Sequence, residues 1–200
     1  MPDKLLLATS NQGKARELKL LLRELPFALV LPGELGITAE VAEVGRSLEE
    51  NARLKATALA SRSGLLALAD DSGLEVEALG GEPGPLSARY AGEGASDKDR
   101  VDYLLAKLKG VPREKRTARF RCVIAVATPE GEVELCSGEC QGLITFGPRG
   151  EKGFGYDPVF YFPGLDKTMA ELPLEVKNKV SHRGEAAREA VKFLRRKYNL

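Results

Sequence analysis

The chain has few of the residues that form covalent or metal cross-links. Its 200 residues include three cysteines and one histidine, and no tryptophan. Three cysteines cannot build a disulfide framework, and with a single histidine they do not give a zinc site of ordinary spacing. A chain of this length buries roughly 70% of its unfolded surface, which is enough for a core without cross-links. We therefore expect reduced, packed thiols.

Long apolar runs and an excess of one charge are also missing. The longest apolar stretches, residues 65–69 and 123–127, are far shorter than the roughly 20 residues that a membrane-spanning helix needs. The start of the chain has no secretory pattern. Because 30 Lys and Arg balance 29 Asp and Glu, the chain has no bulk attraction for a polyanion. We expect a cytoplasmic, globular protein that binds neither membranes nor nucleic acids.

Apolar runs and leucine spacing predict the elements of the first part of the chain. Residues 4–8 and 28–31 have the length and composition of short strands. Leucines at helical spacing predict a helix over residues 14–25, which we expect Pro26 to end. A second helix is predicted over residues 47–62. Strands that alternate with helices in this way are typical of an α/β domain.

The second predicted helix begins with the pattern of a capping box. In Ser47-Leu48-Glu49-Glu50, a serine stands at the N-cap and a glutamate follows three residues later. Each of the two side chains can then accept a hydrogen bond from a backbone amide of the other residue. The helix that follows places Asn51 and Lys55 on one face, because they are four residues apart.

An acidic segment follows the next apolar run. Residues 65–69 predict a buried strand, and residues 74–79 alternate apolar and acidic residues as a half-buried strand does. Asp70-Asp71-Ser72-Gly73 lies between them, and these residue types are common in turns. We therefore expect an acidic turn between two strands.

The second half of the chain predicts a hairpin and two helices. Residues 119–128 and 132–146 predict two long strands joined by a Pro-Glu-Gly turn. Residues 96–109 predict a helix, and residues 183–198 predict a last helix with one apolar stripe. This order predicts an α/β fold, with a mixed sheet flanked by helices, in one domain over residues 1–200.

The segment between the first strand and the first helix is suited to bind an anion. Thr9-Ser10-Asn11-Gln12-Gly13-Lys14 supplies small polar side chains, a glycine and a lysine. Free amides of the first helical turn, the helix dipole and the lysine charge would all favour a phosphate there. The segment lacks the P-loop pattern, and an ordinary helix N-cap would explain it as well. It therefore indicates either a phosphate site or a simple cap.

Asp70 and Asp71 place two carboxylates directly after an apolar strand. Their like charges are costly there unless a cation or hydrogen-bond donors compensate them. Mg²⁺ would compensate them well, because it typically takes one or two carboxylates and keeps waters and substrate phosphates as its other ligands. Glu40, Glu43 or Glu50 could supply a second ligand. The alternative is a turn in which one aspartate caps backbone amides.

Cationic residues precede and open the last predicted helix. Lys177, His182 and Arg183 lie near Ser181, which is the natural N-cap. Because cations oppose the helix dipole at this end, the arrangement is favourable only if an anion or a carbonyl oxygen binds there. The alternative is a solvated basic cluster. Ser181 and His182 do not form a nucleophile–base pair, since neighbouring side chains diverge at a helix start.

An aromatic residue lies in a glycine-rich loop, in Phe154-Gly155-Tyr156-Asp157. An aromatic face there could stack on a nucleobase, and Asp157 could accept a hydrogen bond from a ring N–H. The alternative is an aromatic side chain that packs under a loop.

Seven short segments, in this order, resemble the inosine/xanthosine triphosphate pyrophosphatase family, the Ham1-like enzymes that act on noncanonical purine nucleoside triphosphates. The resemblance covers nearly the whole chain, and seven ordered matches are far more specific than any one of them. The matching segments are Thr9-x-Asn11-x-x-Lys14, Glu50-Asn51-Ala52-x-x-Lys55-Ala56, Ala69-Asp70-Asp71-Ser72-Gly73-Leu74, Gly80-Gly81-x-Pro83-Gly84, Ser87-Ala88-Arg89-Tyr90, Gly153-Phe154-Gly155-Tyr156-Asp157-Pro158 and Ser181-His182-Arg183-Gly184.

The resemblance implies a role for each matching segment. The turn from Thr9 to Lys14 (Thr9, Ser10, Asn11, Gln12, Gly13, Lys14) and Lys55 would hold the triphosphate, and Ser72 would touch the substrate. Asp71 would be the proton acceptor and a magnesium ligand, with Glu43 as a second ligand and Asp70 in support. The remaining nucleotide contacts would be Phe154, Gly155, Tyr156, Asp157, Lys177, His182 and Arg183.

The resemblance also implies a fold, a reaction and a partner. The fold would be two-lobed, with a long curved mixed sheet and a central cleft, and the protein a homodimer. The reaction would convert ITP, dITP or XTP and water to the monophosphate and pyrophosphate with Mg²⁺, for which Mn²⁺ could substitute. The alternatives are a Maf-like nucleotide pyrophosphatase and a nucleotide sensor that does not hydrolyse. The paired aspartates favour an enzyme, because binding alone needs no base.

Overall fold

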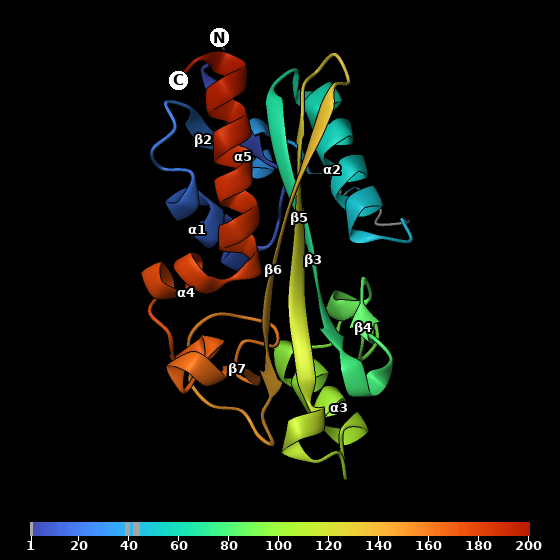
Figure 1. Ribbon diagram of the computed structural model, residues 1–200. Coiled ribbons are helices and arrows are strands. Elements are labelled where there is room, and N and C mark those ends of the chain that lie inside the picture. The colour runs from blue at the N-terminus through green and yellow to red at the C-terminus, as the bar shows by residue number, and fades with distance from the viewer. Residues whose placement is uncertain (1, 39–40, 42–44) are drawn as a thin grey trace. The chain divides into compact units, whose positions relative to one another are not determined.

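The computed structural model describes residues 2–38, 41 and 45–200, and the chain divides into two compact units (Figure 1). Unit 1 comprises Met1–Asp71, Cys122–Gly138 and Arg183–Leu200, and unit 2 comprises Ser72–Arg121 and Glu139–His182. Each unit has hydrophobic clusters of its own. Three strands, β3 (Leu66–Val76), β5 (Thr117–Ala127) and β6 (Val133–Ile144), contribute residues to both units.

Unit 1 is a sheet with helices on both faces. Its further elements are β1 (Lys4–Leu7), α1 (Gln12–Leu21), β2 (Ala28–Val30), the 3₁₀ helix η1 (Pro32–Leu35), α2 (Leu48–Ser63) and, from Arg183 on, α5 (His182–Tyr198). β1 pairs in parallel with β2 and with β3. The strand order there is β2-β1-β3-β5-β6.

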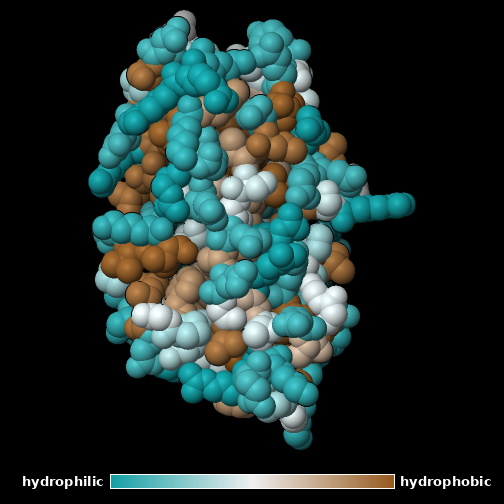
Figure 2. Space-filling view, in the orientation of Figure 1, coloured by the Kyte–Doolittle hydropathy of each residue, from teal (hydrophilic) through white to brown (hydrophobic). Residues whose placement is uncertain are grey.

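Alternation along β1 explains the layers of unit 1. Leu5 and Leu7 belong to a cluster with buried residues of α1 and α5, whereas Leu6 and Ala8 belong to a cluster with buried residues of α2. Successive side chains of a strand point to opposite faces, so α1 and α5 cover one face and α2 covers the other (Figure 1). The outer face of α5 is mostly hydrophilic (Figure 2), which confirms the predicted single apolar stripe.

Unit 2 is built from the other ends of the long strands and several short elements. The strands and helices are β4 (Pro83–Gly84), α3 (Asp97–Lys107), β7 (Phe160–Phe162), β8 (Lys167–Thr168) and α4 (Leu174–Val180), with 3₁₀ helices η2 (Glu77–Leu79), η3 (Ser87–Arg89), η4 (Arg113–Lys115), η5 (Pro163–Leu165) and η6 (Met169–Glu171). β4 pairs antiparallel with β3, and β7 pairs antiparallel with β6 and β8. With the parallel pairs of unit 1, the sheet is mixed, as predicted.

The hairpin is confirmed, and so is the helix over residues 96–109, which forms α3. At the tip of the hairpin, the backbone amide of Thr128 donates to Glu132 at 2.9 Å, and Gly131 donates to Thr128 at 3.0 Å. The first predicted helix ends earlier than expected, at Leu21. None of the described helices is long and apolar enough to cross a membrane.

The predicted acidic turn is wrong, because Asp70, Asp71, Ser72 and Gly73 lie inside the continuous strand β3. Gly73 serves close approach rather than a turn, since a Cβ there would lie 2.4 Å from the carbonyl oxygen of Gly84 in β4. The two aspartates stay in the strand because cations from neighbouring helices compensate their charges.

Candidate functional site

The segment before α1 is a helix cap. Thr9 Oγ1 accepts a hydrogen bond from the amide of Asn11 at 3.1 Å, and Asn11 Oδ1 accepts one from the amide of Lys14 at 3.0 Å. Ser10 and Gln12 are exposed, and Gly13, in the first turn of α1, is half-buried. The cap interpretation is therefore confirmed, and phosphate binding at the same turn stays a prediction.

Asp70 is held by cations from two helices of unit 1. Its Oδ2 lies 3.0 Å from Nε and Nη2 of Arg183, at the start of α5, and 3.3 Å from Nζ of Lys14 in α1. Burial by itself raises the pKa of Asp70, but the charges of Lys14 and Arg183 outweigh it and hold the pKa well below its usual range. Among the described atoms, its Oδ1 is buried without a hydrogen-bond partner.

The thiol of Cys122 is a further contact of Asp70. Cys122 Sγ lies 3.9 Å from Asp70 Oδ2. Burial and the nearby carboxylate raise the pKa of Cys122 to about 12, so the thiol stays protonated and can donate to Asp70. All three cysteines are free and buried, which confirms the expectation of reduced, packed thiols.

Asp71 contacts a different helix. Lys55 Nζ lies 2.9 Å from Asp71 Oδ1 and donates to the carbonyl oxygen of Asp70 at 2.8 Å, while Asn51 Nδ2 donates to Asp71 Oδ2 at 3.3 Å. Asn51 and Lys55 both lie on α2, on one face as predicted. Because neighbours in a strand point to opposite faces, Asp70 faces α1 and α5, whereas Asp71 faces α2.

The start of α2 differs in part from the predicted capping box. Ser47 Oγ accepts a hydrogen bond from the amide of Glu50 at 3.1 Å, as expected. Glu50 Oε2, however, accepts from the amide of Arg46 at 2.6 Å. Asn51 Oδ1 also reaches back to the amide of Gly45 at 2.8 Å. The polar side chains of this first turn thus order the segment that enters α2.

The carboxylates of β3 are compatible with a hard divalent cation. Asp71 and the unpaired Oδ1 of Asp70 offer oxygen atoms, which are the ligands that Mg²⁺ prefers. Among the described residues, no group of three or more His, Cys, Asp and Glu side chains is arranged to hold a metal ion, so the protein would supply only one or two ligands from them. Glu40 and Glu43 lie outside the described residues, and the Glu50 carboxylate caps Arg46.

The predicted aromatic loop of unit 2 is organised by Asp157. Its Oδ2 accepts a hydrogen bond from the amide of Phe154 at 2.8 Å and pairs with Lys177 Nζ of α4 at 2.5 Å. Lys177 Nζ also lies 4.8 Å from the centre of the Phe154 ring. Gly153 is required here, because a Cβ at this positive φ of 77° would overlap the Asp157 carboxylate. Lys177, Asp157 and Phe154 thus form one connected group.

The other residues of the loop are packed rather than exposed. Tyr156 is buried and its hydroxyl donates to the carbonyl oxygen of Ser87 at 2.9 Å. The amide of Gly155 donates to Asp97 Oδ2 at 2.7 Å. The packing alternative therefore holds for Tyr156, while Phe154 is half-buried. Ser72, the first residue of unit 2, follows Asp71 in β3 and is half-buried.

The solvated basic cluster considered for residues 177–183 is wrong. Lys177, Ser181, His182 and Arg183 are all buried. Within unit 2, the His182 ring stacks on Phe120, with ring centres 4.6 Å apart and planes 9° from parallel. Its Nδ1 lies 3.9 Å from the sulfur of Cys140. Ser181 ends α4 and directly precedes α5.

The model of the Ham1 family matches residues 5–193 of this chain. The chain belongs to the Ham1 family. A relative from Desulforamulus reducens named dITP/XTP pyrophosphatase is 51% identical over 98% of this chain and 97% of its own length. A relative of the same name from Methylococcus capsulatus is 54% identical over 94% of each chain. The solved Ham1 protein of Staphylococcus aureus is 43% identical, with a TM-score of 0.85 over 97% of this chain and 99% of its own.

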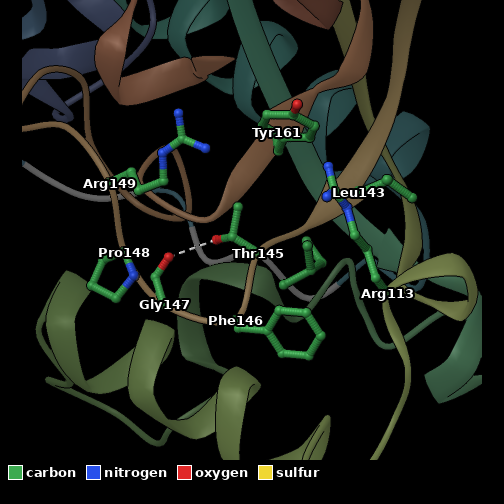
Figure 3. Close-up of a pocket in the computed structure, with 9 residues that line it drawn as sticks. Arg113, Leu143, Thr145, Phe146, Gly147, Pro148, Arg149 and Tyr161 are labelled. Carbon is green, nitrogen blue, oxygen red and sulfur yellow. Dashed lines mark hydrogen bonds between the residues drawn. The ribbon is translucent and has the colours of Figure 1, made fainter. Parts of the chain in front are cut away.

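A pocket in unit 2 of this Ham1 family member contains none of the predicted site residues (Figure 3). It has a volume of about 420 Å³ and is lined by residues of β6, of the loop that follows β6, of β7 and of η4. The guanidinium groups of Arg113 and Arg149 lie 5.4 and 5.6 Å from the centre of the Tyr161 ring, and Arg149 pairs with Glu171 at 3.1 Å. None of its lining residues is an acid that could activate water.

Sequence reasoning missed Glu17, the other carboxylate bound to Arg183. Glu17 is buried in α1, directly before Leu18 and one helical turn before Leu21, which both belong to the apolar stripe. An acidic residue inside an apolar stripe is unusual, because a buried charge is costly without a partner. That signal in the α1 sequence of this Ham1 family member could have identified it.

Proposed function

We propose that the chain hydrolyses noncanonical purine nucleoside triphosphates, namely dITP, ITP and XTP, to the monophosphate and pyrophosphate, and so cleanses the nucleotide pool. The observation that carries this proposal is the pair of the buried Asp71 and the half-buried Lys55, a base and a phosphate-binding cation held 2.9 Å apart. Membership of the Ham1 family over residues 5–193 and the names of the relatives support it.

In this reaction, water attacks the α-phosphorus and pyrophosphate leaves. Asp71 orients the water and accepts its proton at a carboxylate oxygen, with Lys55 and Asn51 holding the carboxylate in place. Lys55 and Lys14 offset the negative charge that builds on the phosphate oxygens, and the cap of α1 offers the amides of a helix N-terminus.

The same proposal includes Mg²⁺, with Mn²⁺ as a substitute. Asp71 is the ligand that we assign from the described residues, with Asp70 and Glu43 as further candidates. When bound, the cation supplies positive charge to the triphosphate. Exposure favours Asp71 over Asp70, because the side chain of Asp71 is 8% exposed, whereas that of Asp70 is fully buried.

We assign base recognition to unit 2. The Phe154 ring offers a stacking surface, and Lys177 offers a donor beside it. Hypoxanthine and xanthine carry a carbonyl oxygen at position 6 that accepts a hydrogen bond, whereas adenine carries an amino group there. A donor such as Lys177 therefore favours the first two bases, because adenine would leave polar groups unpaired.

The alternatives are not favoured. The relatives named above are dITP/XTP pyrophosphatases, not Maf-like enzymes. A sensor that only binds nucleotides has no need for the buried base Asp71. The homodimer and the cytoplasmic location stay proposals. Light scattering after gel filtration tests the first, and a dimer should give twice the chain mass of 21.6 kDa.

Pyrophosphate release from dITP, ITP, XTP, ATP, GTP and UTP tests the proposed function. We expect turnover of the first three with Mg²⁺, little turnover of the others, and loss of turnover in excess EDTA that Mg²⁺ or Mn²⁺ restores. Preference for UTP would indicate a different pyrophosphatase class. Tight dITP binding without pyrophosphate release would indicate a sensor, and full activity in EDTA would exclude the metal.

A further inference from the structure

Glu17 is a charged residue on the buried face of α1. Its side chain is 3% exposed, and it lies beside the core residue Leu18. Its Oε2 lies 2.6 Å from Nη1 of Arg183. A carboxylate in such a position is strongly destabilising unless a cation binds it, so its contact with Arg183 is a structural requirement for α1.

Arg183 connects Glu17 to β3. One arm of its guanidinium binds Glu17, while Nε and Nη2 both lie 3.0 Å from Asp70 Oδ2. The Arg183 side chain is 2% exposed. The fixed fork of a guanidinium can bind two carboxylates in a defined geometry, which a lysine cannot. Arg183 therefore sets the distance and orientation between α1 and the middle of β3.

The next contacts lead to the proposed base. Asp70 directly precedes Asp71 in β3, and Lys55 binds both the backbone oxygen of Asp70 and the carboxylate of Asp71. A displacement of the Asp70 backbone would therefore move Asp71 and one contact of Lys55 together. The contacts run without a gap from Glu17 through Arg183 and Asp70 to Asp71.

We propose that Glu17 is a positioning residue, which holds Arg183 against Asp70 and thereby fixes Asp71 and Lys55 for hydrolysis. This inference rests on the proposed function of Asp71. It also gives Arg183 a role inside unit 1, as a structural link to Asp70, in place of the nucleobase contact expected from the sequence.

The charge of Glu17 is the property that matters. Glu17 and Asp70 balance Arg183 and Lys14 in this part of unit 1. The Glu17→Gln variant keeps the size of the side chain but leaves one buried positive charge in excess. Arg183 then loses the charge of its second carboxylate, so the attraction of Asp70 for its guanidinium is no longer balanced by Glu17. We expect this imbalance to move β3 at the residue that carries the base.

The experiment compares Glu17→Gln, Glu17→Asp and Arg183→Lys with the control Glu24→Gln. Glu24 is a matched control because it also pairs with an arginine of α5, Arg195 at 3.5 Å, but on the exposed surface. For each protein, kcat and KM are measured with dITP and ATP. The Kd is measured for the α,β-methylene analogue of dITP, which cannot be cleaved at the reacting bond.

We expect kcat of Glu17→Gln to fall about tenfold to a hundredfold, as a displacement of about 1 Å at a reacting group does. Arg183→Lys should behave similarly, and Glu17→Asp should be intermediate because it keeps the charge but is shorter. The Kd of the analogue and the ratio of dITP to ATP turnover should change less than about threefold, since no nucleotide contact is removed. Glu24→Gln should match the wild type throughout.

Several results would overturn the inference. A folded Glu17→Gln enzyme with wild-type kcat would show that Glu17 only stabilises α1. A fall in the dITP to ATP ratio in Arg183→Lys would show that Arg183 contacts the base. If Glu17→Gln does not fold, Glu17→Asp and Arg183→Lys decide the question in the same assay.

Hydrogen exchange of the β3 peptide that contains Asp70 and Asp71 gives a readout without turnover. Glu17→Gln should exchange faster there than Glu24→Gln, and equal exchange in the two variants would contradict the inference. A wild-type protein that releases no pyrophosphate from dITP would instead contradict the proposed function. The two failures are therefore distinguishable.

Discussion

The buried and half-buried polar groups of the two units differ in kind. In unit 1, three acids and three cations pair with one another, and these are Glu17, Asp70, Asp71, Lys14, Lys55 and Arg183. In unit 2, one ion pair, between Asp157 and Lys177, lies beside the Phe154 ring, and His182 stacks on Phe120. A network of charges suits phosphate chemistry, whereas one donor beside an aromatic face suits a flat base.

The three cations of unit 1 differ in how far their side chains are exposed to solvent. The side chains of Lys14 and Lys55 are 16% and 12% exposed, whereas that of Arg183 is 2% exposed. The two lysines therefore reach solvent, where a triphosphate could contact them, whereas the guanidinium of Arg183 is bound by Glu17 and Asp70. We therefore propose different roles for the half-buried and the buried cations of unit 1.

The largest effect that we expect comes from Asp71→Asn. The substitution keeps the shape of the side chain, and its amide oxygen can still accept a hydrogen bond from Lys55, but it removes the proton acceptor and gives up the hydrogen bond from Asn51. We expect kcat for dITP to fall about a hundredfold or more, as for loss of a general base, with little change in thermal stability. Pyrophosphate release and a thermal melt measure the two quantities.

Asp102→Asn in unit 2 is the matched control, because Asp102 pairs with Lys98 on the exposed surface of α3. It should retain wild-type kcat. Near-wild-type turnover in Asp71→Asn would show that another carboxylate is the base. It would also contradict the catalytic role that distinguishes the charge network of unit 1 from the polar groups of unit 2.

Local sequence patterns predicted most of the fold, but not the continuity of β3. The helices and the hairpin have periodic apolar residues, which can be read within one segment. Whether Asp70 and Asp71 turn or stay extended depends on partners that are distant in sequence, such as Arg183, 113 residues from Asp70. β4 and β8 have only two residues each, which is too short for any periodicity.

The second expected effect contrasts one lysine from each unit. Lys55→Met removes a charge that every nucleoside triphosphate would meet, so kcat/KM should fall about tenfold or more for dITP and ATP alike. Lys177→Met removes the proposed donor to the 6-carbonyl oxygen. The kcat/KM for dITP should therefore fall more than that for ATP, and the ratio of the two values should decrease. Competition between the two substrates in one reaction measures the ratio directly.

Both variants leave one buried aspartate without its lysine, Asp71 in unit 1 and Asp157 in unit 2, so they are matched in structural cost. An equal decrease of the dITP to ATP ratio in both variants would contradict the assignment of phosphate binding to unit 1 and of base recognition to unit 2. An unchanged dITP to ATP ratio in Lys177→Met would show that Lys177 does not recognise the base.

The candidate site could be predicted to the level of motifs, but not of contacts. Residue types named Asp71, Lys55 and Lys177 as site residues, and the structure places each of them in an ion pair. They did not reveal that Arg183 binds Glu17, which is 166 residues away, or that His182 packs on Phe120. The helix-dipole argument uses only the residues at the start of α5. The carboxylates that compensate the charge of Arg183 lie in α1 and β3.

The smallest expected effect concerns the N-caps of α2 in unit 1 and α3 in unit 2. Ser47 Oγ accepts one hydrogen bond, from the Glu50 amide, whereas Ser96 forms a complete capping box with Asp99. Ser47→Ala and Ser96→Ala should each lower the free energy of unfolding by about 1 kcal/mol, since each leaves one amide to water. Urea unfolding followed by circular dichroism measures this, and Ser47→Thr should retain most of the stability. Neither variant should change kcat, because the apolar core under α2, not its cap, holds Asn51 and Lys55 in register. A fall in kcat in Ser47→Ala alone would show that the first turn of α2 also positions Asp71, and would extend the charge network of unit 1 to the segment that enters this helix.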